Sequence, residues 1–225
     1  MAILHGYNGE VPSGKTSRTI RETFLGITAL PEWLTITGAG TPTGAIVTPD
    51  QSSGGIRLTA SAGAGNSCFL NMFAATGIGF QYLKEIIFEF DSLVLGSNQS
   101  DISFEFLNAA GTKGVVIGQG TEQTVFVKAY HSTNGIKTVN APYQIINNGE
   151  HSRKRNLLIR IQSDGTVGFG EGPHGERESL VFYKTFAANE IELADIMFPK
   201  IGIKNRQAST VTCRIPQVSV TLIHN

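Results

Sequence analysis

The sequence predicts an all-β protein, an antiparallel β-sandwich of the jelly-roll type. Residues 157–169 alternate apolar and polar side chains on both sides of Asp164-Gly165, and Asp and Gly tolerate the positive φ of a type I′ hairpin turn. Many other short stretches alternate in the same way between turn signals, as the strands of a sandwich do. Charged residues are only 16% of the chain and glycines number 26, a composition typical of short strands joined by tight turns.

Residues 1–22 show no sustained periodicity and contain several turn signals. We predict an extended N-terminal arm that lies outside the core and uses Tyr7, Lys15, Arg18 and Arg21 for assembly. A frayed terminus is the ordinary alternative. Because the segment lacks a cationic region followed by an apolar core, we expect synthesis in a cytoplasm and no secretion by a signal peptide.

Residues 23–225 are predicted to form a single jelly-roll domain, because no internal repeat, linker or second core interrupts them. The first strand is expected within residues 24–37, where Trp33 is interpreted as a core anchor. A short strand follows at residues 56–58. Residues 67–73 are apolar on both faces, as in a strand whose sheet is covered on both sides.

Two long strands change their apolar phase partway along. The strand at residues 84–95 shifts after Ser92, and the final strand at residues 209–223 shifts at Pro216. A phase change within one strand indicates a β-bulge or a corner, and Pro is tolerated in sheets at bulges and edges. Both strands are therefore expected to bend.

The remaining segments are assigned from shorter patterns. Further strands are expected at residues 102–106, 115–117, 124–130, 180–182 and 198–203. Residues 131–150 are weakly patterned and predict a long loop with one strand near residues 143–146. Residues 187–191 predict at most one helical turn.

The order of these features resembles the concanavalin A-like and laminin-G-like jelly rolls over most of the chain. The stretches that carry the resemblance are the strand of Trp33, GGIRLTA at 54–60, EIIFEFDSL at 85–93, NLLIRIQSDGTVGF at 156–169, FPKIGI at 198–203 and QVSVTLI at 217–223. Sequences with such a first strand and no secretion signal look most like virion proteins of tailed bacteriophages: head decorations, head fibres or tail-associated adhesins. The resemblance implies a structural role in a virion, with other virion proteins and further copies of the chain as partners. Fold alone does not fix function.

A lectin-like adhesin that binds host-surface glycans is the alternative function. Glycan sites need aromatic faces and a few well-placed hydrogen-bonding groups, and the segment after residue 129 is rich in Asn with two Tyr. The candidate glycan-binding residues are Tyr130, His131, Asn134, Tyr143 and Asn147. Because Asn favours turns, ordinary turn chemistry also explains this composition.

A glycosidase is the third hypothesis, because laminarinase-type relatives carry Glu-x-Asp-x-x-Glu or Glu-x-Asp-x-Glu on one strand. Here Glu89 and Asp91 match the nucleophile and its helper, but the acid/base position holds Leu93 or Val94. Retaining hydrolysis needs two carboxyl groups about 5–5.5 Å apart, and one of them is missing. We therefore expect Glu89 and Asp91 to be solvent-facing strand residues and the protein to be no enzyme.

The sequence predicts no metal site and no cofactor. Asp91, Asn98 and Asp101 could supply oxygen atoms to a calcium ion, but they follow no recognised loop motif. The histidines lack the spacing of a zinc site. Cys68 and Cys213 fall at core positions of their strands and are expected to be buried thiols.

The charge pattern argues against nucleic acid and membranes as partners. Lys and Arg together number 18, as do Asp and Glu, so the formal net charge is zero and no global field attracts an anionic partner. The basic cluster at residues 151–155 has no interleaved aromatic residues. No stretch approaches about 18 consecutive apolar residues, so no membrane insertion is expected. A weakly charged chain is also more natural within an assembly than as a concentrated monomer.

Overall fold

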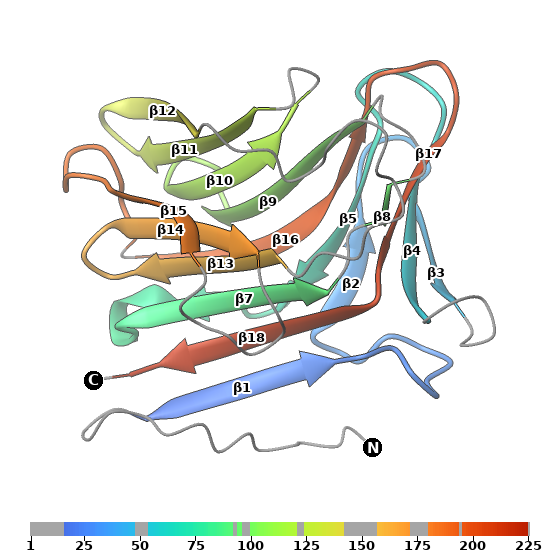
Figure 1. Ribbon diagram of the computed structural model, residues 1–225, viewed down its shortest axis with the longest axis horizontal. Helices are drawn as coiled ribbons and strands as arrows, with labels where there is room; N and C mark the ends of the chain where they lie inside the picture. Colours follow the sequence, from blue (N-terminus) through green and yellow to red (C-terminus); the bar gives the residue numbers. More distant parts are fainter. Residues whose placement is uncertain are drawn as a thin grey trace.

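A computed structural model describes residues 16–47, 54–91, 94–95, 100–120, 124–141, 157–171, 180–193 and 195–224. These residues form three antiparallel sheets and one 3₁₀ turn, η1 (Phe80–Tyr82). Two large sheets pack face to face, and a third, smaller sheet lies at one end of the sandwich (Figure 1). The predicted all-β antiparallel sandwich is confirmed. No helix in this part of the chain is long and apolar enough to span a membrane.

The first sheet has six strands and contains both the described N-terminal strand and the C-terminal strand. In spatial order its members are β1 (Ser17–Glu22), β18 (Gln217–Ile223), β7 (Glu85–Asp91), β13 (Leu157–Gln162), β14 (Thr166–Glu171) and β15 (Leu180–Thr185). Ile159 lies opposite Phe88 on one side and Phe169 on the other, and all three are fully buried. The alternation around the predicted hairpin therefore directs one face of this sheet into the core.

The second sheet has eight strands and covers the other side of the core. Its members are β12 (Gly135–Ala141), β11 (Val125–His131), β10 (Gly114–Gln119), β9 (Ser100–Asn108), β16 (Ile196–Asn205), β5 (Ser67–Met72) and β2 (Leu34–Thr37), with β6 (Ile78–Gly79) paired to β16. Phe104 lies opposite both Ile117 and Ile201. All three face the first sheet and are at most 1% exposed.

The third sheet is connected to the first by strands that follow one another directly in the chain. It contains β3 (Thr43–Val47), β4 (Gly55–Ala60), β17 (Val211–Ile215) and β8 (Val94–Leu95). The two expected bends are the places where the chain changes sheets: β7 of the first sheet is followed by β8, and β17 is followed by β18 of the first sheet. Pro216 separates β17 from β18, where its missing N–H costs no ladder hydrogen bond.

Phenylalanine rings join the two large sheets at the centre of the core. The ring of Phe88 on β7 lies 4.6 Å from Phe104 and 5.5 Å from Phe106 on β9, and Phe90 lies 5.7 Å from Phe104. None of the four is more than 1% exposed. Tilted aromatic pairs at these distances add to the hydrophobic gain of burial. The alternate residues of β7 and β9 that point into the core therefore determine how the two sheets face each other.

The boundary predicted between residues 22 and 23 is corrected, because the end of the predicted arm is a strand of the domain. Ser17–Glu22 pair in register with β18. The Thr19 hydroxyl lies 2.8 Å from that of Thr221, and Arg21 donates to Gln217. Short, polar edge strands show little apolar alternation, which explains why the sequence pattern missed it. Arg18 and Arg21 thus belong to the sheet, and Tyr7 and Lys15 lie outside the described residues.

The hairpin turn differs from the predicted type I′. The N–H of Gly165 donates to the carbonyl of Gln162 (3.1 Å). Gly165 has φ +86°, whereas Asp164 is not among the described residues with positive φ. The turn is therefore a three-residue loop in which only Gly165 occupies the left-handed region. Asp164 instead caps the turn, since its Oδ1 accepts the N–H of Thr166 at 2.8 Å.

The predicted loop at residues 131–150 is also corrected in its first half. Gly135–Ala141 form β12, which pairs with the whole of β11. Most of β12 is exposed, with only Val139 half-buried and Ala141 buried. An edge strand with so few core contacts carries almost no apolar periodicity. The strand expected near residues 143–146 lies outside the described residues.

Candidate functional site

The end of the sandwich opposite the third sheet gathers three connecting segments (Figure 1). They are the β9–β10 turn (residues 109–113), the β11–β12 turn (residues 132–134) and the connection from β15 to β16 (residues 186–193 with Asp195). We call them together the loop end. Phe186, Ile191 and Leu193 are at most 8% exposed and belong to the main core cluster. The connection is therefore anchored by apolar side chains and keeps its polar residues at the surface.

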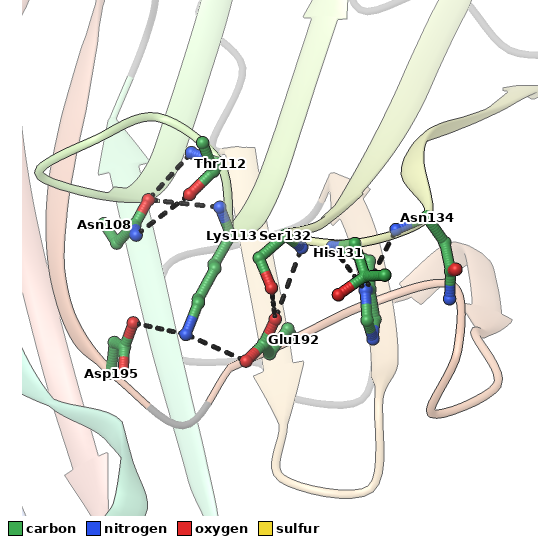
Figure 2. Close-up of polar contacts among 9 residues, drawn as sticks. Asn108, Thr112, Lys113, His131, Ser132, Asn134, Glu192 and Asp195 are labelled. Atoms are coloured by element: carbon green, nitrogen blue, oxygen red, sulfur yellow. Dashed lines mark hydrogen bonds and ion pairs between the residues drawn. The ribbon is translucent and has the colours of Figure 1, made fainter.

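Lys113 lies at the centre of the loop end (Figure 2). Its Nζ lies 2.8 Å from Glu192 Oε1 and 2.8 Å from Asp195 Oδ2. The two N–H groups of Thr112 and Lys113 donate to Asn108 Oδ1 at 2.9 and 3.1 Å, which fixes the turn that carries the ammonium group. The pKa of Lys113 is raised, first by Asp195 and then by Glu192.

Glu192 connects the same network to the β11–β12 turn. Ser132 donates to Glu192 Oε2 through its hydroxyl (2.6 Å) and its N–H (3.3 Å), and the N–H of Glu192 donates to the carbonyl of Tyr130 at 3.1 Å. Lys113 and then Ser132 lower the pKa of Glu192 to about 2. The carboxylate is thus ionised at neutral pH, and its two oxygens hold two turns together.

The β11–β12 turn leaves one hydrogen-bond donor and one acceptor unused. The N–H groups of Thr133 and Asn134 donate to His131 Nδ1 at 3.1 and 3.3 Å. Nδ1 is therefore an acceptor, so the imidazole is neutral and carries its proton on Nε2. Asn134 Nδ2 donates to the carbonyl of Asn189 at 2.9 Å. Within the described part of the chain, His131 Nε2–H and Asn134 Oδ1 have no partner.

A second ion pair lies beside this turn. Lys137 Nζ on β12 is 3.5 Å from Glu190 Oε1, and Glu190 Oε2 accepts the N–H of Ala187 at 3.1 Å. The pKa of Glu190 is lowered, first by that backbone N–H and also by Lys137. Lys184 on β15 lowers it as well. The three carboxylates of Glu190, Glu192 and Asp195 are thus accompanied by the three ammonium groups of Lys113, Lys137 and Lys184.

The structure brings two of the predicted glycan-binding residues together and separates a third. His131 and Asn134 share the β11–β12 turn. The side chain of Tyr130 lies on the outer face of the second sheet, because Ala129 before it faces the core. Burial raises the pKa of Tyr130, and the negative charge of Glu105 raises it further. Tyr143 and Asn147 lie outside the described residues.

Sequence reasoning missed the residues that hold the site. Lys113, Ser132, Glu192 and Asp195 come from three segments, and no motif links them. Each is an ordinary polar residue in or beside a turn, so nothing in the sequence distinguishes it from a solvated side chain. Only the topology, which places the ends of β9, β11 and β16 side by side, brings them together.

The other candidate chemistry lies elsewhere. Glu89 is on the outer face of the first sheet, where Ser219 Oγ donates to its Oε2 at 3.0 Å. Asp101 Oδ2 is paired with Arg206 Nε at 2.7 Å. Among the described residues, no group of three or more His, Cys, Asp or Glu is arranged to hold a metal ion. Asn98 and the side chain of Asp91 fall outside the description.

The predicted buried thiols are confirmed. Cys68 and Cys213 are both free and buried. Burial raises the pKa of each thiol, and in Cys68 the hydrogen bonds with the backbone of Thr59 and Thr43 oppose the increase. Thiols in such surroundings act as small apolar side chains.

No protein-family model and no curated protein sequence matches the chain. Solved structures do match. The carbohydrate-recognition domain of Emp46p in its potassium-bound form has a TM-score of 0.56 at 9% identity, over 88% of this chain and 94% of that one. The binding domain of botulinum neurotoxin DC in complex with rat synaptotagmin II has a TM-score of 0.54 at 10% identity, over 83% of this chain.

These similarities establish the architecture. At 9–10% identity they extend to the fold alone: a concanavalin-like β-sandwich of the kind found in carbohydrate- and receptor-binding domains. The chain spans 43% of the neurotoxin domain. None of the described neighbours is presented as an enzyme.

Proposed function

We propose that this protein is a non-enzymatic, lectin-like module that binds glycans through the β11–β12 turn. The observation that carries the proposal is the pair formed by His131 Nε2–H and Asn134 Oδ1, a donor and an acceptor on one turn that have no partner among the described residues. Neighbouring hydroxyl groups of a sugar ring each donate and accept hydrogen bonds. A fixed donor and a fixed acceptor on one turn are therefore suited to binding hydroxyls of a sugar.

The support beneath this turn strengthens the proposal. His131 Nδ1 is held by two N–H groups, Asn134 is held by Asn189, and Ser132 is held by Glu192. Groups that are ordered before binding lose little entropy when a ligand arrives. The neighbouring structures are consistent with the same class of ligand: one is a carbohydrate-recognition domain, and another is described in a study of neurotoxin entry that depends on two ganglioside molecules.

The setting that we propose is the virion of a tailed bacteriophage, with the module as a tail-associated adhesin. The sequence resemblance and the weakly charged composition support this setting. The protein would be made in the host cytoplasm and assembled with other virion proteins and with copies of itself, and host-surface glycans would be its external partners. Residues 1–15, which include Tyr7 and Lys15, would supply the attachment.

A purely structural virion protein is the second candidate. It is favoured by β15, an edge strand of the first sheet on which Val181 is 50% exposed and Tyr183 is 71% exposed. Apolar side chains on a sheet edge suit contact with a neighbouring subunit. This candidate predicts assembly without glycan binding.

Glycan-array binding of purified protein, followed by titration of the best ligand, tests the proposal. His131→Asp keeps an acceptor for the turn N–H groups and carries no side-chain donor when ionised, and Asn134→Ala removes the Oδ1 acceptor. Each lost hydrogen bond is worth about 0.5–1.5 kcal/mol, so the double variant is expected to bind roughly 5- to 150-fold more weakly. Thr138→Ala, an exposed change on adjoining β12, is the control. A wild-type protein that binds no glycan overturns the proposal and leaves the structural candidate.

A further inference from the structure

The most exposed large apolar side chain among the described residues is the Tyr82 ring. It is 74% exposed, on the 3₁₀ turn η1 that precedes β7. Single exposed apolar residues are normal on a protein surface. Tyr82 differs because the backbone around it is fixed and because its apolar neighbour is also exposed.

The turn that carries Tyr82 is anchored on both sides. Phe80 is 2% exposed and packs edge-on against Phe106 at 5.7 Å, and Leu83 is 6% exposed. The N–H of Leu83 donates to the carbonyl of Phe80 at 2.9 Å, and His224 Nδ1 lies 3.1 Å from the carbonyl of Tyr82. The fold thus immobilises the Tyr82 backbone and leaves its ring in solvent.

Ile196 extends the apolar surface beside this ring. Gly79 on β6 is the cross-strand partner of Ile196 on β16, so the side chain of Ile196 and the position of a Cβ on Gly79 share one face. The Tyr82 Cδ2 atom lies 3.7 Å from that Cβ position. Ile196 is 51% exposed. The ring and the aliphatic side chain therefore form one exposed apolar platform, which we call the Tyr82 platform.

The Tyr82 platform is connected to the loop end by a chain of contacts. The N–H of Phe80 donates to the carbonyl of Asp195 at 3.4 Å. Asp195 is bound by Lys113, Lys113 by Glu192, and Glu192 by Ser132 in the β11–β12 turn. Along this path the side chains of Lys113, Glu192 and Asp195 are 21%, 28% and 43% exposed. A ligand longer than one sugar can lie over these partly exposed polar groups.

We propose that the Tyr82 platform is a second subsite, which stacks one sugar residue of an oligosaccharide whose other end binds the β11–β12 turn. This inference rests on the proposed glycan-binding function. The apolar C–H face of a sugar ring fits an exposed aromatic ring, while its hydroxyls reach the carboxylates along the path.

Calorimetric titration with a ladder of neutral oligosaccharides, from monosaccharide to pentasaccharide, tests this subsite. Tyr82→Ala is expected to weaken binding of the longer chains by about five- to tenfold and to leave monosaccharide binding unchanged. Tyr82→Phe keeps the ring and is expected to retain the affinity. Tyr183→Ala removes an equally exposed tyrosine on β15, which is 71% exposed, and is expected to have no effect.

The outcomes separate the two proposals. If the His131 and Asn134 variants lose binding but Tyr82→Ala does not, the subsite is refuted and glycan binding by the turn stands. If Tyr183→Ala weakens binding as much as Tyr82→Ala, the effect is not specific to the platform and the inference falls. A wild-type protein that binds no glycan overturns both proposals.

Discussion

Two polar clusters of this protein use the same chemistry with different results. On the outer face of the first sheet, Glu85 is 2% exposed and accepts hydrogen bonds from Arg160 and from Gln162; we call these three residues the β7 cluster. At the loop end, the Glu192 carboxylate is engaged as fully, by Lys113 and Ser132. The loop end in addition places a neutral donor and a neutral acceptor without a partner among the described residues on one turn, His131 Nε2–H and Asn134 Oδ1.

The comparison separates structural from binding roles. A buried carboxylate that is fully paired has little left to offer a ligand, and breaking its contacts costs stability. Removing a neutral surface group from water on binding costs less free energy than removing a charged one. The stability of the fold does not depend on such a group. In both clusters the carboxylates hold strands or turns in place. The proposed glycan binding would therefore depend on the neutral groups of the turn that Glu192 holds through Ser132.

Breaking the β7 cluster is expected to have the largest effect on stability. Arg160→Ala removes the guanidinium that pairs with buried Glu85. Among the described residues, Gln162 is then the one side-chain donor left to this carboxylate. The cost is expected to be about 3 kcal/mol of unfolding free energy, measured by denaturant titration. Glycan affinity of the folded protein should not change. A loss below about 1 kcal/mol would mean that this pair is no more than a surface ion pair.

Removing β1 tests how much this edge strand of the first sheet contributes to stability. Deletion of residues 1–22 takes away the strand that pairs with β18, with the contacts from Thr19 to Thr221 and from Arg21 to Gln217. We expect roughly 2 kcal/mol of destabilisation, since several ladder hydrogen bonds are lost. Deletion of residues 1–15 alone should leave unfolding unchanged and instead lower incorporation into virions. Equal unfolding curves for the two deletions would show that β1 is not part of the folded domain.

The sequence pattern predicted those strands that have one face in the core and the other face outside it. On β7, β9 and β13, one face is buried between the sheets, and the apolar alternation follows directly. The edge strands β1 and β12 bury little, so their residues obey no such pattern. The two phase shifts fell between strands of different sheets, β7 and β8 and then β17 and β18, but a phase shift in one strand does not state which sheet the chain enters next.

The candidate site was predictable only in part, for the same physical reason. His131 and Asn134 were singled out because they stand in a segment rich in Asn, and local spacing placed them in one turn. Lys113, Glu192 and Asp195 join the same turn through tertiary contacts that reach it at Ser132. Such contacts produce no repeating pattern in the sequence, because each side chain lies in or beside a turn where many polar residues are tolerated. Their role in glycan binding stays a prediction.

Lowering the pH is expected to have the smallest effect of these changes and to act on the loop end rather than on the β7 cluster. The pKa of Glu192 is lowered from 4.5 to about 2 in the folded protein. A group with a depressed pKa stabilises the fold fully above its unfolded value, and the contribution is lost as the pH falls towards the folded value. The contact of Glu192 with Ser132 should therefore be intact at pH 6 and weaken progressively below pH 4.5.

Amide hydrogen exchange in the β11–β12 turn measures this change. Faster exchange at Ser132, whose N–H donates to Glu192, is expected as the pH falls below 4.5, after correction for the intrinsic rate. Glu192→Gln keeps the shape but removes the titrating group, so its protection should be lower at pH 6 and independent of pH over this range. Pairing between Ile159 and Phe88 in the first sheet is the internal control. If protection at Ser132 falls in parallel in the wild type and the Gln variant, the turn is held by something other than the Glu192 carboxylate.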